Sequence, residues 1–412
     1  MRISLRDLYR RVRFRVLRRV IEGPVFRRLA RPSPAGRSGL AICDLISNFG
    51  DKVMIFPLLD ALRAENPALE ISYFTSGAGA MIGRHPAIDH LYVMDRKIDE
   101  TSYPVSSVLA AWRWWRRDLS RLRFETVVVL RGGVDPFHSH HLAWLLGGRK
   151  RFAYSTRLEP ERAEFELNVA PLFTAQVTEM RGIHEVERGA EVLTLAGLLR
   201  APIDLKRPVR SILALAEEPA SRRFVEEAGL SGREYAIVSP GASTARRAWP
   251  VEDFVELARR QFVARGWLPV IVGGPELGGV AQRMAAEFGG NALDLTGKTD
   301  LAQLAALCAG ARAFVGNDSG TAHVAGAVGT PTVIVTAFAS SSRASHHASP
   351  VRSHPLGPYV AAVQPGSQLS PCTTECLATE PHCISQVGVP EMERVLAAVL
   401  AEAANGASST VS

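Results

Sequence analysis

The chain has 412 residues, enough for two or three domains of ordinary size. Hydrophobic residues make up 47% and charged residues 22%, so wholesale disorder is excluded and a sizeable core is expected. The formal net charge of +7 would by itself suggest nucleic acid or an anionic membrane as a partner.

The positive charge is concentrated at the N-terminus. Residues 1–39 hold twelve Arg and two acidic residues, a charge of +10, which leaves −3 for residues 40–412. Apolar residues between Leu5 and Val20 recur every three or four positions, which predicts an amphipathic helix, followed by a linker up to Gly39. We expect this basic arm, residues 1–31, to lie on the anionic inner face of the inner membrane. Nucleic acid is not expected, because the rest of the chain is net acidic and lacks a recognised binding module; a solvated helix is the alternative.

No secretion or membrane-spanning signal is expected. Arg interrupts every apolar run near the N-terminus, so a signal peptide is not predicted. The chain also has no run of about 18 apolar residues. We therefore expect a cytoplasmic protein that is peripheral to the inner membrane.

Two series of alternating strands and helices follow the arm. In residues 40–205, strands are predicted at 40–46, 71–74, 91–94 and 126–130, and helices at 53–64, 108–122 and 186–199. In residues 206–388, strands are predicted at 235–239, 269–272, 292–295, 313–316 and 332–335, and helices at 251–265, 276–288, 301–310 and 319–328. A helix at 389–404 and a tail at 405–412 end the chain. This alternation predicts an α/β protein with two doubly wound domains, whose ligands bind at the carboxyl ends of strands in a cleft between them.

Three strand ends of the second domain carry residues suited to a nucleotide diphosphate. The first strand end leads into a helix, whose N-terminal backbone N–H groups suit a diphosphate. Its candidate residues are Asp318, Ser319, Gly320, Thr321 and His323. There Asp318 would cap the helix or orient a sugar hydroxyl. A second end carries Ser243 and Arg247, a permanent cation for phosphate, and a third carries Glu276 as an acceptor from ribose hydroxyls. Each loop alone is also typical of a structural cap or turn, and together they predict a nucleotide site.

The first domain offers a candidate general base. Asp51 follows the first strand in the run Ser47-Asn48-Phe49-Gly50-Asp51, where it would deprotonate an acceptor hydroxyl. From spacing alone, a helix cap is the favoured alternative. Further candidates on the acceptor side are Asn48, Lys52 and His138. Lys52 would either keep Asp51 ionised or point to solvent.

Other polar clusters have structural alternatives. His138, His140 and His141 could contact an anionic acceptor, but adjacent histidines on a helix do not share a metal. Alternating Trp and Arg at 112–117 resemble a nucleic-acid or membrane patch, although an amphipathic helix packed on a sheet is favoured. The spacing C-x3-C-x5-H-C, made by Cys372, Cys376, His382 and Cys383, could bind zinc or iron. It differs from a standard zinc finger, so we expect a plain loop and no metal.

Several of these segments together resemble glycosyltransferase family 9, the bacterial heptosyltransferases of lipopolysaccharide core synthesis. The most specific are SNFGDKVMIFPLLDAL at 47–62, PGASTARRAWPVEDF at 240–254 and GNDSGTAHVAGAVGTPTVIV at 316–335. The resemblance implies a GT-B fold, two Rossmann-like domains facing a central cleft, with the donor bound by the second domain. It implies that Asp51 is catalytic and that Ser243, Arg247, Glu276 and the 318–323 loop bind the nucleotide.

The resemblance implies an inverting transfer of heptose from ADP-heptose to a lipid-linked or core oligosaccharide acceptor, without a cofactor or metal. Two alternatives are a GT-B nucleotide-sugar epimerase, which needs no acceptor, and a membrane-associated sugar-nucleotide binding protein without catalysis. The match at the Gly50-Asp51 loop argues against the epimerase, and retention of Asp51, Arg247 and the 316–323 loop argues against a protein without catalysis.

Overall fold

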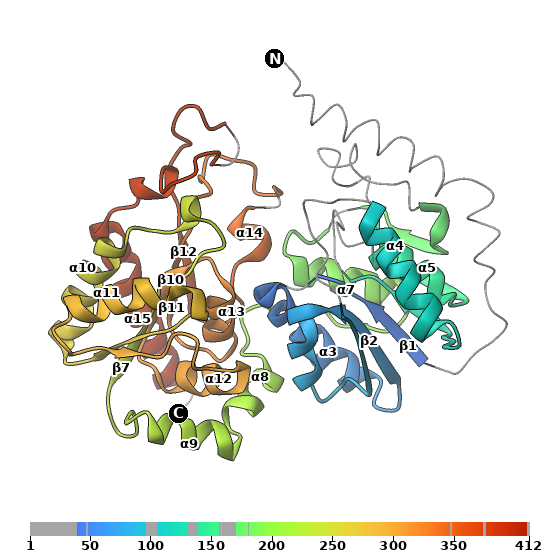
Figure 1. Cartoon of the computed structure of the whole chain (residues 1–412), viewed down its shortest axis with the longest axis horizontal. Helices are drawn as coiled ribbons and strands as arrows, with labels where there is room; N and C mark the ends of the chain where they lie inside the picture. The colour runs from blue at the N-terminus through green and yellow to red at the C-terminus, as the bar shows by residue number, and fades with distance from the viewer. Residues whose placement is uncertain are drawn as a thin grey trace. The chain divides into compact units, whose positions relative to one another are not determined.

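The computed structural model describes residues 39–46, 48–95, 105–130, 139–155, 158, 170–179, 181–346, 348–373 and 376–409. The chain divides into two compact units, Met1–Ile203 and Asp204–Ser412 (Figure 1). The predicted arm, apart from Gly39, and the acceptor-side candidate His138 lie outside the described residues.

The described part of the first unit is built on a six-stranded parallel sheet. Its strands are β1 (Gly39–Cys43), β2 (Glu70–Ser76), β3 (His90–Met94), β4 (Thr126–Val128), β5 (Lys150–Tyr154) and β6 (Ala175–Val177). They lie in the order β3-β2-β1-β4-β5-β6, with Leu40 opposite both Ile71 and Thr126. The winding reverses between β1 and β4, which is where doubly wound sheets bind their ligands.

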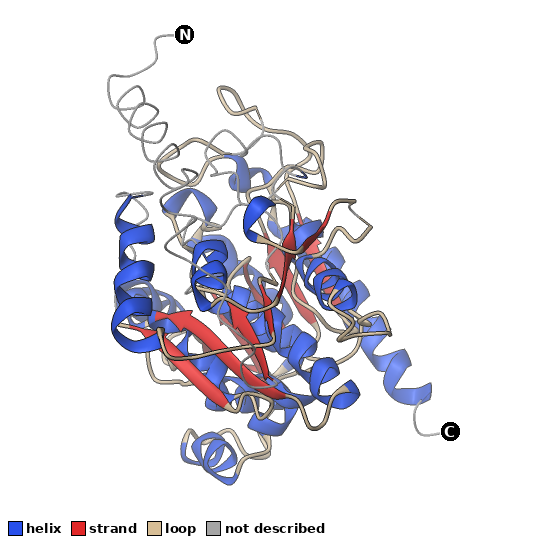
Figure 2. Cartoon of the chain, turned by 90° about the vertical axis from the view of Figure 1, so that its right-hand side faces the viewer, coloured by secondary structure: helices blue, strands red, loops and turns tan. Residues whose placement is uncertain are grey.

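Helices cover both faces of this sheet. On one face α3 (Phe49–Glu65) packs against α7 (Glu185–Leu195), and on the other α4 (Val105–Trp114) packs against α5 (Ser139–Leu146) (Figures 1 and 2). A π-helical turn, Trp115–Leu119, continues α4. Side chains of a strand alternate between faces, so Ala41 and Cys43 share one core with Trp114 and Leu142.

The second unit repeats this architecture. Its strands are β7 (Tyr235–Ser239), β8 (Leu268–Ile271), β9 (Leu293–Asp294), β10 (Phe314–Asn317), β11 (Thr332–Val335) and β12 (Val360–Val363). They pair in parallel in the order β12-β11-β10-β7-β8-β9, so the winding reverses between β7 and β10. The loops that follow β7 and β10 are therefore neighbours at the ligand-binding edge.

Two groups of helices enclose the second sheet. One group consists of α10 (Val251–Gln261), α11 (Gly278–Glu287) and α15 (Val389–Ser409), and the other of α8 (Arg210–Ala216), α9 (Pro219–Glu227), α12 (Leu301–Gly310) and α13 (Gly320–Ala327). A short helix, α14 (Pro350–Ser353), precedes β12. Phe254, Met284 and Met392 come from the three helices of the first group and share one core.

The predicted α/β class with two doubly wound sheets is confirmed. The tail predicted at 405–412 is wrong in part, because α15 remains helical to Ser409. Its last turn packs onto the sheet: a Cβ atom on Gly406 would overlap the hydroxyl of Tyr359. None of the described helices is long and apolar enough to cross a lipid bilayer.

Candidate active site

The loops after β7, β8 and β10 lie side by side in the second unit, because β7 pairs with both of the other strands. The backbones of β7 and β10 approach closely at Gly316, where an added Cβ would lie 2.8 Å from the Ser239 carbonyl oxygen. Polar side chains from strand ends that are distant in sequence are thereby gathered at one edge of the sheet.

Arg247 joins two of these loops. It ends a short 3₁₀ helix, Ala245–Arg247, and its Nη2 donates to Asp318 Oδ2 at 3.1 Å while Nη1 donates to Ser243 Oγ at 3.3 Å. The Arg247 side chain remains 39% exposed, whereas that of Asp318 is 11% exposed. Asp318 therefore orients the guanidinium, and the N-cap of α13 is Ser319. This arrangement presents a cation at the sheet edge, where an anion can reach it.

Three hydroxyl groups surround the start of α13. Thr321 Oγ1 lies 2.7 Å from Ser239 Oγ and 2.9 Å from Ser319 Oγ. Ser319 has extended backbone and makes no side-chain cap bond, and Gly320 is the first residue of the helix. The N-terminus of a helix carries partial positive charge, so hydroxyl donors and backbone N–H groups here suit a phosphate.

Asn317 braces these loops and is a residue that the sequence prediction missed. It is fully buried; its Oδ1 accepts from the Trp249 backbone N–H at 2.9 Å, and its Nδ2 donates to the Pro240 carbonyl at 2.7 Å. The signal in the sequence is an amide at the end of an apolar strand, where Asn is normally disfavoured. It holds the segment that carries Arg247 against the end of β10.

Glu276 and His323, the two remaining residues predicted to contact the nucleotide, differ in their exposure to solvent. Glu276 is exposed in a 3₁₀ turn, Pro275–Leu277, and a Cβ atom on Gly274 would overlap its carboxylate. Glycine at 274 therefore lets the carboxylate fold back over the end of β8. His323 is only 5% exposed and lies inside α13, so its ring is covered by protein.

In the first unit, Asp51 lies where β1 ends and α3 begins. Asn48 is the N-cap residue of α3, and its Nδ2 donates to Asp51 Oδ2 at 3.0 Å. Asp51 is thus in the first turn and is not the cap, and the helix dipole favours its charged form. A small cavity beside it is lined by Asp44, Asp51, Met54, Ile55, Leu130 and Glu185. Leu130 follows β4, so the cavity lies at the switch point of this sheet.

Lys52 is buried beneath this edge, so the prediction that it points to solvent is wrong, whereas its role in keeping Asp51 ionised stays a prediction. Its side chain is 0% exposed, and Nζ lies 2.6 Å from Asp44 Oδ2 and 2.8 Å from the Asp44 carbonyl oxygen. The Tyr73 hydroxyl donates to the same carboxylate oxygen at 2.6 Å. Burial, and then the Asp44 charge, raise the pKa of Tyr73 well above its usual range, so it remains a donor. Lys52 therefore acts within the core and not on the surface that an acceptor would reach.

Two of the other polar clusters have structural roles. His140 and His141 are buried in α5, and the His140 ring lies edge-on to Phe173 with centroids 5.5 Å apart. Trp114 is in the core, Trp112 and Trp115 pack against it, and Arg116 lies over the Trp112 ring. The favoured amphipathic helix is therefore confirmed at 112–117.

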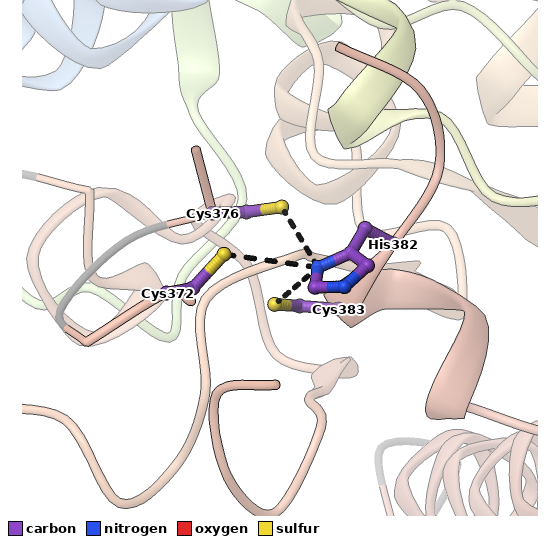
Figure 3. Close-up of side chains that lie close together, drawn as sticks. All are labelled: Cys372, Cys376, His382 and Cys383. Carbon is purple, nitrogen blue, oxygen red and sulfur yellow. Dashed lines mark hydrogen bonds between the residues drawn. The ribbon is translucent and has the colours of Figure 1, made fainter. Parts of the chain in front are cut away.

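One group of potential metal ligands is found among the described residues, and it lies in the second unit. It consists of Cys372, Cys376, His382 and Cys383, drawn in Figure 3. The five cysteines of the chain are all free thiols, and Cys43 and Cys308 are buried far along the chain from this group.

Comparison with known proteins places these features in context. A family model described as glycosyltransferase family 9 (heptosyltransferase) matches residues 112–375, more than half of the chain. The chain is 24% identical over 294 residues to lipopolysaccharide heptosyltransferase 3 of Escherichia coli, a match that covers 69% of this chain and 79% of that protein.

Two solved structures are similar over most of the chain. E. coli ADP-heptose lps heptosyltransferase II has a TM-score of 0.61 at 19% identity, covering 89% of this chain and 99% of that one. The glycosyl transferase family 9 structure from Veillonella parvula has a TM-score of 0.63 at 19% identity, covering 89% of this chain and 98% of that one. These likenesses confirm the predicted GT-B fold of two Rossmann-like units. That the two units face a central cleft stays a prediction.

Proposed function

Because the chain belongs to glycosyltransferase family 9, and so is a sugar-transferring enzyme, we propose that it moves heptose from ADP-heptose to a glycan of the lipopolysaccharide core, with inversion. The donor is supported by the similar E. coli structure, which is that of ADP-heptose lps heptosyltransferase II. The acceptor is supported by the lipopolysaccharide heptosyltransferase that matches in sequence.

The observation that carries this proposal is the arrangement around Arg247. A guanidinium held by Asp318 and Ser243 stands beside the N-terminus of α13, at the point where the winding of the sheet reverses. A fixed cation and a helix N-terminus stabilise the negative charge that develops on a departing nucleotide diphosphate. Ser319, Gly320 and Thr321 supply N–H and hydroxyl donors, and Glu276 accepts from the ribose hydroxyls. His323 packs behind the loop.

Asp51 is the proposed general base. Its carboxylate is oriented by Asn48 in the first turn of α3, which favours the ionised form that a base requires. It takes the proton from the acceptor hydroxyl as that oxygen attacks the anomeric carbon and the bond to the diphosphate breaks. The proton acceptor and the donors to the leaving group are side chains and backbone groups of this chain, so the proposed transfer step needs no metal ion.

The basic arm supports a location beside a lipid-borne acceptor. Residues 1–39 carry +10 and the remainder −3, so the charge that attracts an anionic surface is confined to one segment. A cytoplasmic enzyme held on the inner face of the inner membrane would meet an acceptor anchored in the same leaflet.

The reaction is tested by product analysis. The protein is incubated with ADP-heptose in the presence and absence of a panel of acceptors, Kdo-lipid A and its heptosylated forms, and products are identified by mass spectrometry. We expect ADP and a heptosylated acceptor to appear only when an acceptor is present. An epimerised nucleotide sugar formed without acceptor would instead identify an epimerase, and no turnover with any acceptor would contradict the proposal.

A further inference from the structure

The loop that precedes α15 gathers four ligand-type side chains. Cys372, Cys376, His382 and Cys383 each offer one sulfur or nitrogen atom, and these four atoms all lie within 4.8 Å of one another. Figure 3 shows the three sulfur atoms directed at one ring nitrogen of His382. The distances from Nδ1 are 3.7 Å to Cys372, 3.9 Å to Cys376 and 3.4 Å to Cys383.

Hydrogen bonding alone does not explain this convergence. A histidine ring nitrogen has either one N–H or one lone pair in the ring plane, so it satisfies one sulfur at a time. A cation among the four atoms satisfies them all. For Zn–S bonds of about 2.3 Å, a Zn–N bond of about 2.0 Å and tetrahedral angles, the sulfur–nitrogen separation is about 3.5 Å. The three observed distances lie on either side of that value.

The surroundings also resemble those of a structural metal. The three cysteines are at most 7% exposed and belong to a hydrophobic core cluster of the second unit. The Leu377 backbone N–H donates to Cys372 Sγ at 3.3 Å. Outer donors of this kind orient metal ligands and tune their charge.

We propose that Cys372, Cys376, His382 and Cys383 bind one Zn²⁺ ion in a closed tetrahedral site. Three thiolates and one imidazole are a ligand set of structural zinc sites, and they leave no open position for a substrate. The site is therefore structural and takes no part in the sugar transfer. The spacing marks these four residues as possible ligands, but it differs from a standard finger motif and so favours a plain loop; the fold brings Cys372 and Cys376 to His382.

The zinc site stabilises the turn at 383–387, which packs behind the loops proposed to bind the nucleotide. This role rests on the proposed function. Cys383 begins a 3₁₀ turn, Cys383–Gln386, and the next carbonyl, that of Val387, accepts from the Trp249 indole N–H at 2.8 Å. The Trp249 backbone N–H in turn donates to Asn317. Zinc at this loop would fix a chain of contacts that ends two residues from Arg247.

Metal content tests the proposal directly. The full chain, expressed with added zinc and purified without chelator, should hold about one zinc per chain by mass spectrometric metal analysis. We expect Cys372→Ser and Cys376→Ser to lower that ratio at least fivefold, and His382→Cys, which keeps four ligands, to retain it. Cys308→Ala is the matched control, because Cys308 is a buried thiol of the same unit outside the cluster, and should keep its zinc.

A second measurement uses the unaltered protein, in case the serine variants do not fold. After zinc is replaced by Co²⁺, the protein should show thiolate-to-cobalt charge-transfer bands and the intense visible bands of a tetrahedral site. Substoichiometric zinc in the wild-type chain, equal zinc in the cluster variants, or a disulfide between cluster cysteines in the native protein would overturn the proposal. None of these measurements involves a sugar nucleotide, so they stand or fall separately from the proposed function.

Discussion

Arg247 is the residue on which the proposed nucleotide site most depends. Its pair with Asp318 is 39% exposed on the arginine side, so it adds little to the stability of the fold. The value of the pair lies in orientation, because a guanidinium fixed at 3.1 Å from one carboxylate keeps a constant direction toward the start of α13. Removing Arg247 should therefore affect ligand binding far more than folding.

We expect Arg247→Ala to raise the Kd for ADP by about 10- to 100-fold, since hydrogen bonds to charged groups contribute about 1.5–3 kcal/mol. Isothermal titration calorimetry measures this change. Arg246→Ala is the matched control, because Arg246 lies in the same 3₁₀ helix without the contact to Asp318, and its Kd should stay close to that of the wild type. Equal weakening in the two variants would contradict the role given to Arg247.

At the scale of elements, the ion pair of Lys52 and Asp44 connects three of them. Lys52 comes from α3, Asp44 follows β1, and Tyr73 on β2 donates to the same carboxylate. The pair is almost completely buried, with side chains 0% and 6% exposed. Losing one member leaves the other charge in the core, which is costly. This tie fixes the first turn of α3, and with it Asp51.

Lys52→Met should lower the free energy of unfolding by about 3 kcal/mol, because the buried Asp44 carboxylate loses Lys52 as its ion-pair partner and keeps only neutral donors such as the Tyr73 hydroxyl and the Ile46 backbone N–H. Urea denaturation followed by circular dichroism gives the value. Combining Lys52→Met with Asp44→Asn should recover part of the loss, since the uncompensated charge is then gone. If the single variant lost less than about 1 kcal/mol, the ion pair of Lys52 and Asp44 would not be important for the stability of the fold.

Sequence patterns predict elements where local signals are strong. The helix predicted at 301–310 has those bounds in the structure, where Asp300 and Gln303 form a capping box. The short edge strands β6 and β12 were not predicted, since they have only three and four residues and are largely half-exposed.

In the candidate site, too, residues marked by local sequence signals are predicted, and those that depend on tertiary contacts are not. Arg247 and the 318–321 loop are marked by Gly and Ser directly after apolar strands, whereas the burial of Lys52 depends on tertiary contacts with Asp44, which also accepts from Tyr73 on β2. The convergence of Cys372 and Cys376 on His382 likewise depends on how the loop folds, which spacing does not encode.

At the scale of the whole molecule, charge and chemistry are separated along the chain. The residues proposed for catalysis and donor binding all lie within residues 40–412, which carry −3, whereas the excess of Arg lies in residues 1–39. We therefore expect the net charge of +7 to determine where the enzyme is held and not what it binds in its active site.

We expect the full chain to co-sediment with vesicles of phosphatidylglycerol and phosphatidylethanolamine, and a 40–412 variant to remain in the supernatant. The physical reason is the attraction of an anionic surface for lysine and arginine, about 1 kcal/mol each. Binding should weaken as salt is added, because the interaction is screened. Equal sedimentation of the two forms would remove the role proposed for the arm.

The central claim, that this family 9 enzyme transfers a sugar with Asp51 as the base, is tested most directly by acceptor-dependent ADP release in Asp51→Asn. Asp60→Asn, the same change further along α3, is the control. We predict that Asp51→Asn lowers kcat by a factor of about 100 or more with the Kd for ADP unchanged, and that Asp60→Asn retains transfer. ADP release by Asp51→Asn at the wild-type rate would contradict the account.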